Sequence, residues 1–248
     1  MKAMLWGLLL VWILSVTGSV RADLDYEELS VFADEADLRR TVEIFSSERS
    51  RVSGYPGCAR AAEYIRRQFE EIGLQHIRTE EYGVTVPVDE GATLLPGGQT
   101  GRIVGEEEPP IPLYGMWPNL VRTSMLPPEG LRGALIYAPE GAFAEYNGYE
   151  VEGSITLMEF NTWNNWLNGA MLGTKAVIFI EPDSTTHAQG DQKYVQVPLS
   201  VPRFWISKEE GRRLAERLQT ESLEVQLQAR MTWQKRPTWN ILGPAAQG

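Results

Sequence analysis

The sequence predicts a mixed α/β (α+β) protein, and three observations carry this prediction. Two amphipathic helices stand in the first third of the chain, a strand–helix–strand unit follows in the middle, and an alternating strand comes near the end. The chain has 248 residues, of which 43% are hydrophobic and 23% are charged. This composition is sufficient for a packed core, and it excludes a largely disordered chain, a collagen-like chain and a membrane protein with several spans.

The N-terminal segment 1–22 has the organisation of a signal peptide. Lys2 provides a positive start, Leu5–Val16 is almost wholly apolar, and Val20 and Ala22 occupy the small-residue positions before a signal-peptidase cut. We expect cleavage after Ala22 and a secreted or periplasmic product. The alternative is an uncleaved segment that anchors the chain in a membrane.

The mature chain is expected to open with two helices. Asp34–Phe45 and Ala59–Ile72 both repeat apolar residues at helical spacing, and Gly73 ends the second helix. The polar segment Ser46–Cys58 between them predicts a loop, and Leu74–Val88 alternates like a strand. The apolar faces of the two helices consist of Leu38, Val42 and Phe45 in the first and of Ala61, Ile65, Phe69 and Ile72 in the second.

A Pro- and Gly-rich stretch, Gly83–Gly130, follows. It contains eight of the 15 prolines in the chain. Such a composition predicts irregular, turn-rich chain with short strands at most. We interpret this stretch as a domain junction.

The pattern becomes strand-like again after Leu131. Ala134–Tyr137 and Ser154–Phe160 are β-rich, Thr162–Leu172 fits a helix, and Lys175–Ile180 is a short apolar run suited to a buried strand. Since a helix connects the last two strands, we expect them to be parallel. The expected apolar face of the helix consists of Trp163, Trp166, Leu167, Ala170 and Met171.

The C-terminal part adds one helix and two strands. Ser207 and Glu210 form a capping box that opens a helix through Leu218. Alternating apolar residues then predict a strand over Leu223–Trp233, and Trp239–Leu242 starts another.

Charge and composition exclude several functions. The formal net charge is -10, whereas nucleic-acid binding requires a basic face, so we expect no nucleic-acid partner. One Cys and two His exclude a disulfide framework and a multi-Cys zinc site. No nucleophile elbow, phosphate-binding loop or His-Glu-x-x-His motif is present in the sequence.

The individual candidates for chemistry are weak. Neither His76 nor His187 has an acid two residues later, and Cys58 has no nearby base, so we interpret all three as surface or packing residues. An acid–base hydrolase using unpaired carboxylates is conceivable, but Glu80 with Glu81, and Glu106–Glu108, are typical of solvated faces.

Two further features have both a structural and a functional interpretation. Arg49 and Arg51 lie in the predicted interhelical loop, which is either a solubilising connection or a docking loop whose arginines meet carboxylates elsewhere. Trp163 and Trp166 are typical of a packed core and, less often, of a ligand cage.

Taken together, several segments resemble parts of secreted zinc aminopeptidases. Ser46–Gly73 resembles the N-terminal helix–loop–helix of the family that includes bacterial leucyl aminopeptidases and glutamate carboxypeptidase II. Val151–Leu218 resembles a protease-associated (PA) domain, marked by Gly169–Ile180 and by Val201–Ser207 with the Gly211-Arg-Arg-Leu run. Asn240–Gly243 resembles the first core strand of the peptidase after the PA insertion.

The resemblance implies a division of the chain. The expected parts are a signal peptide (1–22), an N-terminal helical segment of the peptidase (23–88), a junction (89–130), a PA-like domain (131–230) and the truncated start of the peptidase core (231–248).

The resemblance also implies an activity that this chain does not carry by itself. In the complete family member, two zinc ions and a glutamate base hydrolyse a peptide or protein substrate. None of those ligands can be matched here, so we assign no catalytic, cofactor-binding or metal residue and expect the chain alone to be inactive. The alternative is a stand-alone, non-catalytic PA-type protein-binding module.

Overall fold

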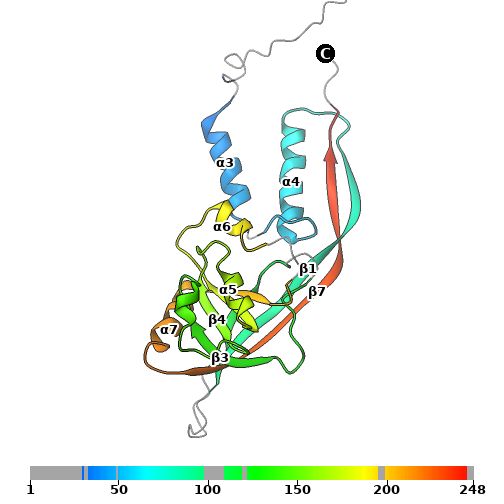
Figure 1. The fold of residues 1–248 in the computed structure, drawn as a ribbon. Helices are drawn as coiled ribbons and strands as arrows, with labels where there is room; N and C mark the ends of the chain where they lie inside the picture. The colour runs from blue at the N-terminus through cyan, green and yellow to red at the C-terminus, as the bar shows by residue number, and fades with distance from the viewer. Residues whose placement is uncertain are drawn as a thin grey trace, which may run out of the picture.

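A computed structural model describes residues 30, 33–48, 50–97, 109–118, 122–194 and 199–244. Seven strands form a closed barrel in the order β1-β2-β6-β5-β4-β3-β7 (Figure 1). The strands are β1 (Arg78–Gly97), β2 (Ile111–Gly115), β3 (Leu131–Tyr137), β4 (Ile155–Glu159), β5 (Ala176–Ile180), β6 (Arg203–Ile206) and β7 (Leu223–Leu242). The helices are α3 (Glu35–Ser46), α4 (Pro56–Glu71), η1 (Phe143–Tyr146), α5 (Trp166–Met171), α6 (His187–Asp191) and α7 (Lys208–Arg217). The expected mixed α/β class is confirmed.

The barrel is parallel on one side. β3, β4, β5 and β6 are parallel neighbours, and β1, β2 and β7 join them in antiparallel pairs. The expected parallel pairing of Ser154–Phe160 with Lys175–Ile180 is therefore confirmed, with Leu157 opposite Ile178.

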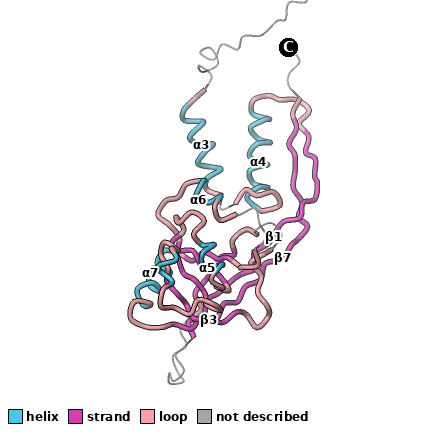
Figure 2. Tube along the Cα trace, in the orientation of Figure 1, coloured by secondary structure: helices cyan, strands magenta, loops and turns pink. Residues whose placement is uncertain are grey.

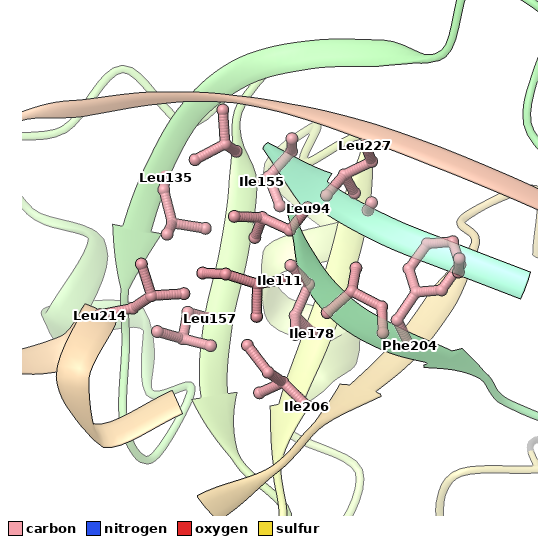
Figure 3. Close-up of a cluster of buried hydrophobic side chains, with 14 of the residues drawn as sticks. Leu94, Ile111, Leu135, Ile155, Leu157, Ile178, Phe204, Ile206, Leu214 and Leu227 are labelled. Carbon is pink, nitrogen blue, oxygen red and sulfur yellow. The ribbon is translucent and has the colours of Figure 1, made fainter. Parts of the chain in front are cut away.

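The main core fills the barrel. Alternate residues of the strands point inward, and α7 adds Leu214 from one end (Figure 3). β5 is buried along its whole length, because its other face packs under α5. The labelled members of the inner cluster are Leu94, Ile111, Leu135, Ile155, Leu157, Ile178, Phe204, Ile206, Leu214 and Leu227.

A second cluster covers the outer face of β4 and β5. Met158, Val177 and Phe179 pack against Trp166 of α5. This helix is shorter than the predicted Thr162–Leu172 segment, since Trp163 has a φ of 49° and lies outside it. Trp163 and Met171 are exposed, so the expected single buried face is wrong at both ends.

β1 and β7 are much longer than the other strands. They pair without interruption from Arg78 opposite Leu242 to Asp89 opposite Met231, and after a bulge they continue as barrel strands. We call the paired segments 78–88 and 232–242 the arm; it extends beyond the barrel (Figures 1 and 2). Gly83–Gly130 is therefore more regular than expected, and Trp239–Leu242 is part of β7 and not a separate strand.

The two N-terminal helices accompany the arm. α4 packs along β7, and Thr41 of α3 lies 2.9 Å from Tyr64 of α4, hydroxyl to hydroxyl. α4 begins at Pro56, three residues before the predicted start, because proline suits the first helical turn. Cys58 is consequently helical and not part of the loop.

The apolar faces of these helices are largely uncovered. α3 contains no buried residue, and Leu38 and Val42 are 60% and 65% exposed. In α4 the expected buried stripe is only half-buried and Ile72 is exposed.

Two further sequence expectations concern the cap of α7 and the signal segment. Ser207 caps α7 by accepting from Glu210 N–H, as predicted. The signal segment lies outside the described residues; within those residues, no helix is long and apolar enough to cross a membrane.

Candidate functional site

A hollow lies beside the bulge of β1, next to the main core of the barrel. Its volume is about 870 Å³, and we call it the barrel groove. Ala92, Leu126 and Ala229 provide apolar lining, and Met125 is exposed beside them. The complete lining comprises Gly91, Ala92, Thr93, Arg122, Met125, Leu126, Pro127, Pro128, Gln228, Ala229, Arg230 and Thr232.

The bulge gives this groove its shape. Gly91 has a φ of 119°, which only glycine adopts readily, and its N–H donates to the Asp89 carboxylate at 2.9 Å. The other oxygen of that carboxylate accepts from Gly115 N–H at 2.8 Å. The turn of β1 is thus fixed to β2 by one side chain.

Two arginines, Arg122 and Arg230, line the groove, and one of them is paired. Arg230 forms an ion pair with Glu90, whose pKa is lowered by hydrogen bonds from Thr232 and by the charge of Arg230. Arg122 forms no ion pair within the described residues. The lining contains no His, Cys, Asp, Glu or Lys, so the groove can bind a ligand but offers no general base.

The interhelical loop docks on the arm. Tyr55 donates a hydrogen bond to the carbonyl of Pro87 and lies against Trp117, with 6.3 Å between ring centroids. Burial raises the pKa of Tyr55, and the Asp89 charge adds to this shift. A second cavity of about 330 Å³ lies beside this contact, between Tyr55, Arg236 and Trp239.

Within the described residues, Arg51 forms no ion pair with a distant carboxylate of the kind that the docking hypothesis expected. Arg51 lies over the ring of Phe45, 5.2 Å from its centroid, and Arg49 is outside the described residues. The carboxylate of the loop, Glu48, instead pairs with Arg60 of α4, and the hydrogen bond from Arg60 lowers the pKa of Glu48.

The two histidines lie in different elements of the fold. His76 is exposed, with a φ of 53°, in the turn between α4 and β1. His187 begins α6, and its Nδ1 lies 3.1 Å from Asp191, one helical turn later. Sequence reasoning missed this pair because it searched for an acid two residues away, whereas a helix brings residue i+4 alongside.

The other candidates are engaged in structural contacts. Cys58 is half-buried, with Sγ 3.6 Å from the Thr238 hydroxyl. Glu80 lies 3.4 Å from Arg78, and Glu81 accepts from the indole of Trp239 at 3.1 Å. Glu106–Glu108 lies outside the described residues.

A zinc pair does not fit the residues that the structure describes. No group of three or more His, Cys, Asp or Glu side chains gathers there with the geometry of a metal site. The His187–Asp191 pair is exposed and has no third ligand within those ranges. No catalytic step through a metal is therefore derived from this chain.

The two tryptophans of the predicted helix lie in different environments. Trp166 is fully buried and donates from its indole N–H to the Gln192 carbonyl at 3.0 Å. Trp163 is exposed, so the two rings do not form a common cage.

No family model and no curated protein matches this chain. Among solved structures, a peptidase M28 precursor from Shewanella amazonensis SB2B aligns with 81% of this chain and 49% of its own, at 12% identity and a TM-score of 0.50. An aminopeptidase from Aneurinibacillus sp. strain AM-1 aligns with 86% of this chain and 49% of its own, at 21% identity and a TM-score of 0.44.

The first of these similarities extends to the fold. The described chain has the mixed α/β architecture of part of a peptidase M28 precursor. It spans about half the length of each of these two proteins.

Proposed function

We propose that this chain is the N-terminal and PA-like part of an exported zinc-dependent aminopeptidase and is inactive by itself. In this proposal α3, α4 and the arm belong to the peptidase domain, and residues 131–230 of the barrel form the inserted PA-like unit. The fold similarity to a peptidase M28 precursor supports the assignment, and so does the order of the segments along the chain.

One observation carries the proposal: apolar side chains of the helices beside the arm are not covered by any other described part of the chain. α3 buries no residue, although Leu38 and Val42 share a face. Within the described ranges, residues 78–88 of β1 pair with β7 alone. A two-stranded ribbon with one helix is marginally stable in water, so a further sheet and its helices are the expected covering.

The PA-like unit, residues 131–230, has a binding role in this proposal and no chemistry of its own. Two zinc ions would be held by histidines and carboxylates of the complete protein, and a glutamate would take the proton of the attacking water. The barrel would flank the site and contact the substrate chain.

The test measures the zinc content and the peptidase activity of the purified chain, and it reads the gene beyond the last codon of the chain. The purified chain should hold no stoichiometric zinc by mass spectrometry and should not cleave leucyl amides with added zinc. Sequencing beyond the codon for Gly248 should find a frame that encodes a His-x-Asp after a β-strand. Stoichiometric zinc with chelator-sensitive turnover by this chain would overturn the assigned inactivity.

Export is tested separately. The basic start and apolar run of residues 1–22 support a cleaved signal peptide. N-terminal sequencing of the exported protein should begin at Asp23. Recovery of an intact Met1 in the membrane fraction would instead establish an uncleaved anchor.

The barrel groove favours a second candidate function, a stand-alone PA-type binding module. Its apolar lining, with Arg122, which forms no ion pair within the described residues, is suited to a protein segment that carries a carboxylate. A chain that is monodisperse alone and whose binding to an acidic peptide is lost in Arg122→Gln would favour this candidate. Self-association through α3 would favour the peptidase proposal.

A further inference from the structure

The outer edge of β1 in the arm is exposed to solvent. In the arm, β7 lies between α4 and β1, so this edge is on the side away from the helix (Figure 1). Thr79, Glu81, Gly83 and Thr85 are all exposed. What the edge can bind depends on the direction of its backbone N–H and C=O groups.

Two prolines fix that direction. In an antiparallel pair, opposite residues alternate between those that bond to each other and those whose backbone groups point away from each other. Pro87 lies opposite Trp233, and Pro237 lies opposite Gly83, so both pairs belong to the same alternating set. Proline has no N–H to donate to a ladder, so this set is the one that points away. The Tyr55 hydroxyl donates to the carbonyl of Pro87, which agrees with the outward direction.

The alternation continues along the arm without a shift, since the register is unbroken from Arg78 to Asp89. The N–H and C=O groups of four residues therefore point away from β7, and we call Thr79, Glu81, Gly83 and Thr85 the outward residues. Among the described residues, no other backbone group bonds to them. A row of alternating donors and acceptors is thus available to another strand.

The two faces of this edge differ in chemistry. Because side chains alternate along a strand, Glu81 lies on one face with Gly83, and Tyr82 lies on the other with Val84. The Glu81 carboxylate accepts from the Trp239 indole and forms no ion pair within the described residues. The Tyr82 side chain is 44% exposed. One face therefore suits a basic side chain, and the other suits an aromatic or β-branched one.

The neighbouring charges restrict the occupant further. Lys235 lies over Gly83, since a Cβ on that glycine would be 2.8 Å from the lysine Cε, so a second basic residue is disfavoured there. Glu80 lies 3.4 Å from Arg78, the only basic residue of the edge. A second copy of the chain would bring the same acidic edge and is therefore a poor occupant.

We propose that the outward residues of β1 bind an extended peptide segment as an added strand, with a basic residue opposite Glu81 and a β-branched or aromatic residue opposite Tyr82. Backbone hydrogen bonds provide affinity, and the two side-chain contacts provide selectivity. The formal net charge of -10 favours the approach of a basic segment. A further sheet of the proposed peptidase can extend from β7, so this binding does not depend on that assignment.

The first experiment measures fluorescence anisotropy while the chain is titrated into a labelled peptide, Thr-Val-Lys-Val-Thr-Val-Thr. In a strand this peptide presents its lysine on one face and its valines on the other. Replacing the lysine by glutamate should weaken binding about threefold or more. N-methylation of the lysine and of the next threonine removes two donors to β1 and should weaken binding at least about tenfold. Equal binding of the three peptides, or no binding, would overturn the proposal.

A pair of variants tests the contact with Glu81. Glu81→Gln should weaken binding of the lysine peptide about two- to fivefold and should not weaken binding of the glutamate peptide. The matched control is Glu209→Gln, which removes the same charge from an exposed position of α7 and should leave the affinity unchanged. Equal losses in the two variants would show a general attraction and would overturn the assigned contact.

Hydrogen exchange locates the peptide on the unmodified chain. The amides of Glu80, Tyr82 and Val84 are protected by β7, whereas those of the outward residues should exchange freely. Saturating lysine peptide should slow exchange of the outward amides at least about tenfold. Binding that leaves these amides unprotected would place the peptide elsewhere and overturn the proposal. So would protection without peptide that rises with protein concentration, because a second copy would then occupy the edge.

Discussion

The ammonium of Lys193 donates a hydrogen bond to the main-chain carbonyl of Trp163, a residue that adopts a left-handed backbone conformation. The N–H of Trp163 in turn donates to the side chain of Gln189 on α6, at 2.9 Å. The left-handed conformation costs free energy for a non-glycine residue, and here hydrogen bonds hold both the carbonyl and the N–H of Trp163. The segment around α6 is fastened to the barrel through this turn and through the Trp166–Gln192 hydrogen bond.

This buried ammonium should make stability depend on alkaline pH. Burial lowers the pKa of Lys193 to about 8, whereas the unfolded value is near 10.5. Between these values the unfolded chain binds more protons, so the free energy of unfolding rises with pH across that window, by up to about 3 kcal/mol. Lys193→Met should flatten the rise, measured by urea unfolding at several pH values.

The neutral-pH stability gives a second readout of the same variant. Removing the charge relieves its desolvation penalty but leaves the Trp163 carbonyl without its donor, which costs about 1–3 kcal/mol. We therefore expect Lys193→Met to equal or exceed the unmodified chain at pH 7. Arg203 titrates at higher pH, so the comparison is restricted to the range below its pKa of about 10. A variant with an unchanged alkaline rise would contradict the assignment to Lys193.

The inner core should be intolerant of charge. Ile178 is fully buried in β5, opposite Leu157 on one side and Phe204 on the other. Ile178→Asp places an unpaired carboxylate among these side chains and should cost several kcal/mol, roughly 3 or more. The matched control Ile178→Val should cost about 1 kcal/mol. A melting temperature unchanged by Ile178→Asp would show that this position is not in the core.

The regular elements of the barrel could be predicted because local signals agreed with the fold. The apolar run Lys175–Ile180 can be buried only as a central strand, and a helix between two such runs imposes parallel pairing. Ser207 has one low-energy role before a helix, that of a cap.

The strand expected at Leu74–Val88 is confirmed as the first part of β1, but its continuation to Gly97 and its pairing with β7 could not be predicted, because the two strands are distant in sequence. Pro87 and Gly91 are turn signals locally, yet β1 continues through both. Eighteen residues of β7 pair with β1, and a bulge accommodates Gly91. Proline is tolerated at Pro87 because the carbonyl and not an N–H forms the contact with Tyr55.

The two buried cations carried no sequence signal at all. Lys193 and Arg203 stand in polar or mixed segments where a charged side chain normally reaches solvent. Only the tertiary arrangement of α5, α6 and β6 encloses them. The burial predicted for the first helix is wrong in the opposite direction. Amphipathic spacing predicts that Leu38 and Val42 are buried, whereas both side chains are exposed in the structure.

A glycine pair tests the packing of the helices on the barrel. A Cβ on Gly211 of α7 would lie 2.8 Å from two carbons of Ile180, whereas one on Gly190 of α6 would have nothing within 4 Å. Gly211→Ala should therefore destabilise by about 1–3 kcal/mol through overpacking. Gly190→Ala should be neutral or stabilising by up to about 1 kcal/mol, from helix propensity. Equal effects of the two substitutions would show that α7 is not held against Ile180.

The exposed face of α3 should govern the solution behaviour of the isolated chain. Leu38 and Val42 contribute no buried area, so replacing both by Gln should change Tm little while it removes the apolar surface that two copies can share. The contrasting variant is Thr41→Val, which breaks the hydroxyl contact with Tyr64 and should loosen α3 by about 1 kcal/mol without changing that surface. Sedimentation velocity over a range of concentrations should find self-association in the unmodified chain and in Thr41→Val, and a monomer in the double variant.

In the complete peptidase that we propose, the same double substitution should instead lower Tm, because another part of the protein would cover these side chains. A double variant that self-associates as strongly as the unmodified chain would show that the sticky surface lies elsewhere, and it would remove the observation on which the covering domain is inferred.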